Sequence, residues 1–353
     1  MNEPALPTDA SSLETRPAAV APRHPAGWAA ARDGDTYAAL DLGTNNCRLL
    51  VARGAGRGFR VIDAFSRIVR LGEGLAATGV LSEPAMTRTI EALKVCAGKV
   101  IHRRVTRARY VATEACRRAG NCAEFVTRVR ERTGIDIEII PSAEEARLVV
   151  AGCAPLLDRS VPHAVVFDIG GGSTELVWLG VPRDPRAAPR VIDFLSLPHG
   201  VVTLTDRYGG REVSRATYDA MVTEMRDALA PFEEHHRIAA RIARGEVQML
   251  GSSGTVTTLA GIHLELPRYN RARVDGTVLS FDCARAVSER LMGLDYEARA
   301  AHPCIGNERA DLVLAGCAIL EAICQLWPVG RLRVADRGIR EGILMGLLGA
   351  RWR

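Results

Sequence analysis

Two short segments of the chain place an aspartate and a glycine-containing turn between apolar runs. They are AALDLGTNNCRLLV (Ala38–Val51) and VVFDIGGGSTELVW (Val165–Trp178). Aligned without a gap, Asp41 falls on Asp168, Gly43 on Gly170, and Arg48 on Glu175. The function of both segments depends on what such a turn can bind.

A turn of this kind suits an anion. Glycines adopt positive φ and let a ligand approach the backbone closely, and consecutive N–H groups that point inward form a nest for a phosphate. An aspartate before the turn can hold a hydrated Mg²⁺ that bridges phosphate oxygens. A single turn is equally typical of an ordinary glycine-rich hairpin. Two in register, one in each half of the chain, favour a site that holds a phosphate chain from both sides.

A third segment, MLGSSGTVTTL (Met249–Leu259), reads as a strand, a Gly/Ser turn and the start of a helix. Helix N-termini bind anions through free N–H groups and the macrodipole. The segment has neither the Gly-Lys-Ser/Thr of a Walker A motif nor the glycine spacing of a dinucleotide-binding fingerprint. It therefore adds a possible phosphate contact from the second half without indicating either of those nucleotide folds.

The composition is that of an ordinary globular protein. Of the 353 residues, 47% are hydrophobic and 25% are charged, and the formal net charge is +5. The length predicts two domains with a substantial core. The small positive excess favours an anionic substrate without indicating a nucleic-acid partner. Because the sequence has no apolar run of membrane-spanning length and no secretory signal, we expect a cytoplasmic protein with no membrane partner.

The nine cysteines contain no CxxC pair. An odd number of cysteines in apolar surroundings predicts free thiols in a reducing compartment, with no disulfide framework and no zinc site.

The remainder of the chain alternates between strand and helix patterns, which is typical of an α/β fold. Strands are expected at Tyr37–Asp41, Cys47–Arg53, Arg60–Arg70, Arg109–Thr113, Asp136–Ile140, Ala164–Asp168, Glu175–Leu179, Arg190–Leu197, Val247–Leu250 and Leu332–Ala335. Helices are expected from Ser82 to about Ile101 and at Cys122–Arg132, Arg215–His235, Thr255–Leu264, Cys283–Leu291, Ala310–Gln325 and Ile339–Leu348. A further helix should begin at Ser142, where Glu145 stands at capping-box spacing. Each half begins with a hairpin, so the pattern indicates an internal two-fold repeat.

These segments, in this order, resemble the actin, sugar-kinase and heat-shock-chaperone ATPase superfold, and within it the exopolyphosphatase and guanosine pentaphosphate phosphatase (Ppx/GppA) family. Five more segments carry the resemblance: Ile68–Leu75 (IVRLGEGL), Ala112–Asn121 (ATEACRRAGN), Ile140–Arg147 (IPSAEEAR), Arg309–Gly316 (RADLVLAG) and Val334–Gly342 (VADRGIREG). Two positions depart from the family pattern. Glu114 stands where the family has a serine that would donate to phosphate, and Asn46 replaces another serine.

The resemblance implies roles for individual residues. Glu145 matches the catalytic base, although a glutamate in a first helical turn could serve only as a cap. Asp168 and Glu175 match catalytic carboxylates that also hold metal, with Asp41 as the metal ligand from the first half. The implied phosphate-binding residues are Gly43, Thr44, Asn45, Asn46, Arg70, Thr113, Arg117, Gly170, Gly171, Gly172, Ser173, Ser253, Gly254 and Thr255. The implied cofactor is Mg²⁺ (or Mn²⁺).

The same resemblance implies two actin-like domains around a central cleft. We expect a disordered tail at residues 1–35, a first domain at 36–141 completed by a C-terminal helix at about 338–353, and a second domain at 142–337. The expected partner is inorganic polyphosphate or guanosine pentaphosphate, and the interpretation leaves room for a homodimer. Three functions stay open: an exopolyphosphatase, a guanosine pentaphosphate 5′-phosphatase of the stringent response, and a sensor that binds these compounds without hydrolysis.

Overall fold

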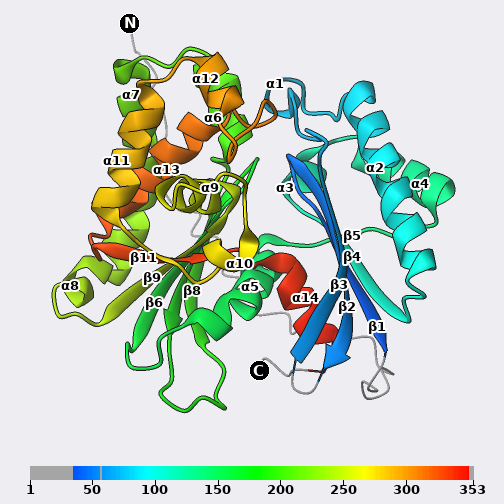
Figure 1. Ribbon diagram of the computed structural model, residues 1–353, viewed down its shortest axis with the longest axis horizontal. Coiled ribbons are helices and arrows are strands. Elements are labelled where there is room, and N and C mark those ends of the chain that lie inside the picture. Colours follow the sequence, from blue (N-terminus) through cyan, green and yellow to red (C-terminus); the bar gives the residue numbers. More distant parts are fainter. Residues whose placement is uncertain (1–34, 56–57, 350–353) are drawn as a thin grey trace, which may run out of the picture. The chain divides into compact units, whose positions relative to one another are not determined.

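The chain folds around two mixed β-sheets (Figure 1). The computed structural model describes residues 35–55 and 58–349. Nearly all of the expected tail at 1–35, and the end of the expected C-terminal helix at 350–353, lie outside the described residues. The described residues belong to one compact unit, so the expected domain boundaries stay a prediction.

Each sheet repeats the same strand order. The first sheet runs β3-β2-β1-β4-β5 and the second runs β10-β11-β9-β6-β7-β8. The first contains β1 (Thr36–Leu42), β2 (Asn46–Ala55), β3 (Gly58–Ile68), β4 (Arg107–Ala112) and β5 (Glu138–Ile139). The second contains β6 (His163–Ile169), β7 (Thr174–Gly180), β8 (Arg190–Leu197), β9 (Val247–Ser253), β10 (Val278–Ser280) and β11 (Arg331–Ala335). In the first sheet, β1, β2 and β3 form an antiparallel meander, and β4 pairs parallel to β1. In the second sheet, β6, β7 and β8 form the same meander, and β9 pairs parallel to β6. The expected α/β fold with two actin-like halves is confirmed.

The register of the two first hairpins confirms the internal alignment made from the sequence. Asp41 pairs with Arg48 across β1 and β2, and Asp168 pairs with Glu175 across β6 and β7. In each hairpin the glycine two residues after the aspartate donates its N–H over 2.9 Å to the backbone carbonyl oxygen three residues later. The two turns are therefore structural equivalents.

The first strand of each sheet is buried on both faces, which explains its apolar sequence. Along β1, Tyr37 and Ala39 face one hydrophobic cluster, whereas Ala38 and Leu40 face another. β6 alternates in the same way between two clusters. This alternation follows the two-residue period of a strand, and it brings the polar end of each strand out beyond the core.

Helices cover both faces of each sheet. In the first half they are α1 (Leu75–Thr78), α2 (Glu83–His102), α3 (Glu114–Arg118) and α4 (Cys122–Thr133). In the second half they are α6 (Val201–Tyr208), α7 (Arg215–His236), α8 (Ile238–Ile242), α9 (Gly254–His263), α10 (Arg271–Val274), α11 (Phe281–Met292), α12 (Tyr296–Ala301) and α13 (Val313–Leu326). The short elements α1, α3, α6, α8, α10, α12 and β10 were not expected from the sequence pattern.

Two helices join the halves. α5 (Ser142–Cys153, followed by a 3₁₀ turn at Ala154–Leu156) packs on the second sheet, and α14 (Ile339–Leu347) packs on the first. Figure 1 shows them side by side between the sheets. A Cβ on Gly342 would stand 2.1 Å from the carbonyl oxygen of Leu148, and one on Gly152 would stand 2.2 Å from that of Gly338. Glycine is therefore required for this contact, which fixes α5.

The expected capping box of α5 is wrong. Pro141 occupies the N-cap and Ser142 is the first helical residue, with no side-chain hydrogen bond to the cap. The carboxylate of Glu145 instead accepts a hydrogen bond from Arg117. Spacing alone suggested the cap, but the chain enters the helix one residue earlier than the box requires.

Candidate active site

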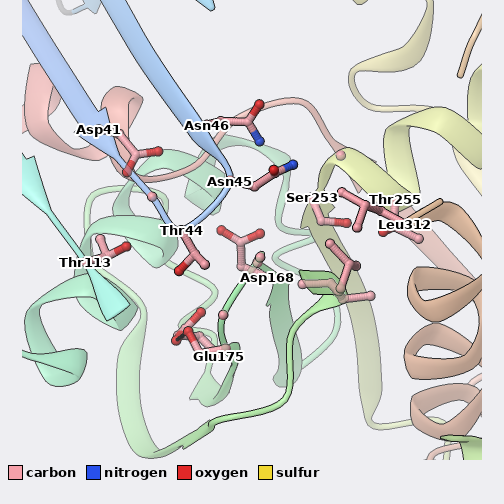
Figure 2. A pocket seen from close by; sticks show the side chains of 18 of the residues that line it. Asp41, Thr44, Asn45, Asn46, Thr113, Asp168, Glu175, Ser253, Thr255 and Leu312 are labelled. Atoms are coloured by element: carbon pink, nitrogen blue, oxygen red, sulfur yellow. Dashed lines mark hydrogen bonds between the residues drawn. The ribbon is translucent and has the colours of Figure 1, made fainter. Parts of the chain in front are cut away.

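One cavity gathers the two equivalent turns, the start of α9 and the first turn of α5 (Figure 2). Every residue predicted for the site lines it except Arg70 and Arg117. Figure 2 shows Thr44, Asn45 and Asp168 around its centre, with Ser253 and Thr255 on the far side. These residues come together because the strands that carry them are neighbours within each sheet and end at the same edge.

The two turns pack directly against each other. A Cβ on Gly171 would stand 3.0 Å from the Cβ of Asn45, and one on Gly172 would stand 2.5 Å from the hydroxyl of Thr44. None of Gly170, Gly171 and Gly172 has positive φ. The positive φ expected at the triple glycine is therefore wrong, whereas the room that these glycines would leave for a phosphate stays a prediction. At least two of these glycines are required because the other turn lies against them.

Four carboxylates converge on the cavity. Asp41 and Asp168 are the second-last residues of β1 and β6. Glu175 is the second residue of β7, and Glu145 lies in α5. The Glu145 and Glu175 residues are only 5% and 2% exposed. Glu175 accepts hydrogen bonds from the hydroxyls of Ser173 (2.7 Å) and Ser196 (3.1 Å). Acidic groups collected in this way are costly unless a cation or protons balance them.

The pKa values of these groups reflect that cost. Burial raises the pKa of Asp168 to about 7, with Glu145 and Asp41 adding to the effect and Arg48 opposing it. Burial likewise raises the pKa of Glu175 to about 7. The pKa of Asp41 is raised by burial, and that of Glu145 lies well above its usual value because of burial and the charge of Glu175. One or more of the four therefore holds a proton near neutral pH when no cation is bound.

Two arginines in the cavity were missed from the sequence. Arg48 and Arg309 both line it, and among the described residues neither forms an ion pair or a side-chain hydrogen bond. Burial and the nearby charge of Arg48 lower the pKa of Arg309. Half-buried arginines that line a cavity without an ion-paired carboxylate fit an anionic ligand. The signal for Arg48 was its equivalence to Glu175 in the aligned turns, and Arg309 opens one of the quoted segments.

The start of α9 adds further polar groups. Ser253 caps this ten-residue helix by accepting a 3.0 Å hydrogen bond from the N–H of Val256. Gly254 and Thr255 follow in the first turn and line the cavity. The side-chain amide oxygens of Asn45 and Asn46 are buried without a hydrogen-bond partner among the described residues. The helix N-terminus adds backbone N–H groups and a positive potential to this side of the cavity.

Comparison with known proteins identifies what kind of site this is. The model of the Ppx/GppA phosphatase family matches residues 50–351. The chain belongs to the Ppx/GppA phosphatase family. The match begins after the Asp41 turn, so the place of that turn in the site rests on the structure. Members of this family are phosphatases, which agrees with a cavity of carboxylates, arginines and backbone donors.

Solved structures agree with this assignment. The chain is 27% identical to an exopolyphosphatase-like protein, with a TM-score of 0.80 over 89% of this chain and 98% of that one. It is 28% identical to the Ppx/GppA enzyme of Aquifex aeolicus, with a TM-score of 0.72 over 88% of this chain and 99% of that one. An exopolyphosphatase from Cytophaga hutchinsonii shares the fold at 23% identity, with a TM-score of 0.80 over 90% and 99% of the two chains.

The Ppx/GppA pattern also explains why the position of Arg117 is unexpected. Its guanidinium donates to Glu145 (2.7 Å), to the carbonyl oxygen of Ile140 (2.9 Å) and, through two nitrogens, to Glu114 (2.9 and 3.2 Å). Arg117 therefore lies behind the carboxylate of Glu145 and not on the cavity wall. Glu114, which departs from the family serine, holds it there. Because Arg117 does not line the cavity, its expected phosphate contact has no support from the position of the side chain and stays a prediction.

Arg70 likewise lies off the cavity. It donates two hydrogen bonds to the carboxylate of Asp311 (2.9 and 3.1 Å) and a third to the carbonyl oxygen of Glu308 (3.3 Å). Asp311 and Glu308 flank Arg309 in the chain. Arg70 thus ties the segment after β3 to the segment that presents Arg309 to the cavity, and its expected phosphate contact stays a prediction.

The donors present fit a hard divalent cation. Asp41, Asp168 and Glu175 offer carboxylate oxygens, which are the ligands that Mg²⁺ prefers, and Mg²⁺ usually keeps several waters and takes one or two carboxylates. Burial raises the pKa of all three carboxyls, and a cation bound beside them would favour their charged forms. Among the described residues, these three carboxylates do not bring their oxygens within 4.8 Å of one another. They therefore suit an ion that keeps some of its water ligands.

Proposed function

We propose that the chain is an exopolyphosphatase, which releases orthophosphate from the end of inorganic polyphosphate. The observation that carries the proposal is that one cavity holds a buried glutamate, Glu145, together with Arg48 and Arg309, which form no ion pair or side-chain hydrogen bond among the described residues. The arginines suit the negative charge of a phosphate chain, and the glutamate suits a water molecule that must lose a proton. Similarity to an exopolyphosphatase-like protein supports the choice of substrate.

The reaction is the attack of water on the terminal phosphorus. A bond forms between the water oxygen and phosphorus, the bond to the bridging oxygen breaks, and the shortened chain leaves with its electron pair. Phosphoryl transfer of this kind depends on positioning and on neutralising charge more than on covalent chemistry. The residues around the cavity supply both requirements.

Glu145 is the proposed base that takes the proton from water. A base must hold the proton that it takes from water, and burial together with the charge of Glu175 raises the pKa of Glu145 well above its usual range. Arg117 opposes that shift and holds the carboxylate in place. Glu175 is held by hydrogen bonds from Ser173 and Ser196. Its negative charge adds to the effect of burial in raising the pKa of Glu145.

The proposed phosphate contacts come from both halves. Arg48, Thr44, Asn45 and Asn46 stand on one side, and the Gly170–Ser173 turn, the start of α9 and Arg309 stand on the other. Arginine binds two phosphate oxygens at once, and helix N-termini favour anions. The proposed cofactor is Mg²⁺ or Mn²⁺ held by Asp41, Asp168 and Glu175, which would supply charge neutralisation at the phosphate oxygens.

The test is phosphate release by the purified full chain with Mg²⁺. Long-chain polyphosphate, short-chain polyphosphate and guanosine pentaphosphate are compared for the wild type, Glu145→Gln and Asp168→Asn. Glu144→Gln is the matched control, because Glu144 precedes the base in the same helical turn but pairs with Arg109 (2.9 Å) and does not line the cavity. Loss of a general base costs roughly 10²- to 10⁴-fold.

Release from polyphosphate, lost in both site variants and kept in the control, would support the proposal. Release from guanosine pentaphosphate alone would move the assignment to a 5′-phosphatase of that nucleotide. Binding of these compounds without any release would favour a sensor.

A further inference from the structure

A second group of ligand-bearing side chains lies at the edge of the second sheet. Asp193 stands on the edge strand β8, and His235 and His236 end the long helix α7. One ligand atom from each of the three residues lies within 4.8 Å of the other two. None of the three lines the cavity described above, so the proposed phosphatase chemistry does not account for them.

His236 is already held in a suitable position. Its Nε2 lies 2.9 Å from a carboxylate oxygen of Asp193. Its ring packs on Phe232, with 4.5 Å between centroids, and its side chain is only 11% exposed. His235 is exposed and stands at right angles to His236, with 4.6 Å between ring centroids. Two imidazoles and a carboxylate therefore face a common point, with one side open to solvent.

Two features of the backbone direct these residues to that point. β8 has a register shift opposite Trp178 and Leu179, which leaves Ile192 as an extra residue immediately before Asp193. Bulges of this kind re-aim side chains at sheet edges. The last turn of α7 carries both histidines, and the negative end of the helix dipole stabilises a cation there. The positions of the three side chains and the helix dipole of α7 thus both favour a positive ion beside His235 and His236.

We propose that Asp193, His235 and His236 bind a divalent transition-metal ion of the Zn²⁺ type, which links the end of α7 to the edge strand β8. Imidazole nitrogen and carboxylate oxygen are ordinary zinc ligands, and three of them leave a position for water. Mg²⁺ prefers oxygen ligands and would not select two imidazoles. The expectation of no zinc site came from cysteine spacing, and this group contains no cysteine.

The competing explanation is a simple hydrogen bond between His236 and Asp193, with His235 beside it by chance. The two explanations differ in what they require of His235. A hydrogen-bonded pair does not need this exposed side chain, whereas a three-ligand site loses one ligand without it. His235→Ala is therefore the deciding variant, and its exposure makes a folding defect an improbable cause of any change.

The experiment titrates the full chain with Zn²⁺ in competition with a chromogenic chelator, in excess Mg²⁺. Wild type is compared with His235→Ala and Asp193→Asn, and with His102→Ala as the control, because His102 is an exposed histidine at the end of another helix. Zinc held by the cavity carboxylates is common to all four proteins and cancels in the comparison.

We expect the wild type to bind one equivalent of Zn²⁺. The affinity should fall in His235→Ala and in Asp193→Asn by at least about 10- to 100-fold, which is the loss typical for an outer-shell partner of a metal ligand. The affinity of His102→Ala should be unchanged.

Thermal unfolding gives a second readout, because an ion that binds only the native state raises Tm. Zn²⁺ should raise the Tm of wild type more than that of His235→Ala. Equal affinity in wild type and His235→Ala, or no tight equivalent in wild type, would overturn the proposal. If Asp193→Asn does not fold, the comparison with His235→Ala decides alone.

Discussion

Arg117 donates a 2.7 Å hydrogen bond to Glu145 and lies behind that carboxylate, away from the cavity wall. The arrangement depends on Glu114, which accepts from two other nitrogens of the same guanidinium. A site in which a serine replaced Glu114 would leave those nitrogens free. In this chain Arg117 therefore acts on the proposed base, and its influence on phosphate is indirect.

The first prediction concerns the protonation of Glu145. The charge of Arg117 lowers the pKa of this buried carboxyl, against the larger effect of burial. Arg117→Ala should therefore raise that pKa further. Because a base must be deprotonated, the acidic limb of the pH–rate profile should move upward by the same amount. The measurement is phosphate release between pH 5 and 9.

Arg118→Ala provides the control for this prediction. Arg118 follows Arg117 on α3 but is largely exposed and reaches Glu114 only at 4.0 Å. Its removal should leave the profile in place. An unchanged acidic limb in Arg117→Ala would show that Arg117 does not set the protonation of the base.

The second prediction concerns the stability of the metal-free protein. The pKa of Asp168 is about 7 in the folded chain and 3.8 for the free side chain, so the folded state binds more protons between these values. Stability must then fall as pH rises through that window. Asp168→Asn removes the titration, and its Tm in EDTA should exceed that of wild type at pH 8 by more than at pH 5. The difference corresponds to about 2 kcal/mol after allowance for the water-facing cavity.

Mg²⁺ supplies the internal check on that result. The ion should raise the Tm of the wild type at pH 8, where it replaces the missing proton, and should raise the Tm of Asp168→Asn less. A wild type that is as stable as the variant at both pH values would mean that Asp168 carries no electrostatic cost.

The third prediction concerns the contact between the two turns. Gly172→Ala places a Cβ 2.5 Å from the hydroxyl of Thr44 and 3.1 Å from Glu114. Overpacking of this kind typically costs about 1 to 3 kcal/mol, and relief requires the turns to separate. We expect a lower Tm together with a lower kcat.

Gly346→Ala is the matched control for the turn contact. It lies in α14 with open space around its Cβ position, and alanine favours helix by about 1 kcal/mol. Its Tm should be unchanged or higher. A Gly172→Ala protein with normal Tm and activity would mean that the turns are not pressed together as they are here.

The sequence predicted the sheets well because their signal is local. β1 and β6 must be apolar on both faces, and each ends at an aspartate that cannot enter the core, so both strand position and hairpin register could be read from the residues. The same argument fails for α3 and α6, which are five and eight residues long and have too few turns for a helical period to show.

The arginines show where sequence reasoning stops. Arg117 stands in a segment that matches a family motif, yet its partners come from residues 114, 140 and 145, which only the folded chain brings together. Arg309 lies some 260 residues from Arg48 in the chain, and no periodicity connects them. The glycine-rich turns predicted backbone contacts with phosphate. Which charged side chains face the cavity depends on tertiary packing, which the sequence pattern does not show.

The last prediction concerns those charges. If Arg309 binds a terminal phosphate, Arg309→Ala should raise KM for polyphosphate more than it lowers kcat, since the contact exists before and after attack. Hydrogen bonds to charged groups contribute about 1.5 to 3 kcal/mol, so KM should rise roughly 10- to 150-fold. Arg309→Lys, which keeps the charge but loses the two-nitrogen fork, should recover part of the loss.

The control for Arg309 is Arg290, an exposed arginine of α11 that does not line the cavity. Arg290→Ala changes the net charge by the same amount, so it measures any general electrostatic effect on an anionic substrate. An equal rise of KM in both variants would assign the effect to net charge. A rise confined to Arg309→Ala, smaller in Arg309→Lys, would assign it to a direct phosphate contact made from the segment that Arg70 and Asp311 hold in place.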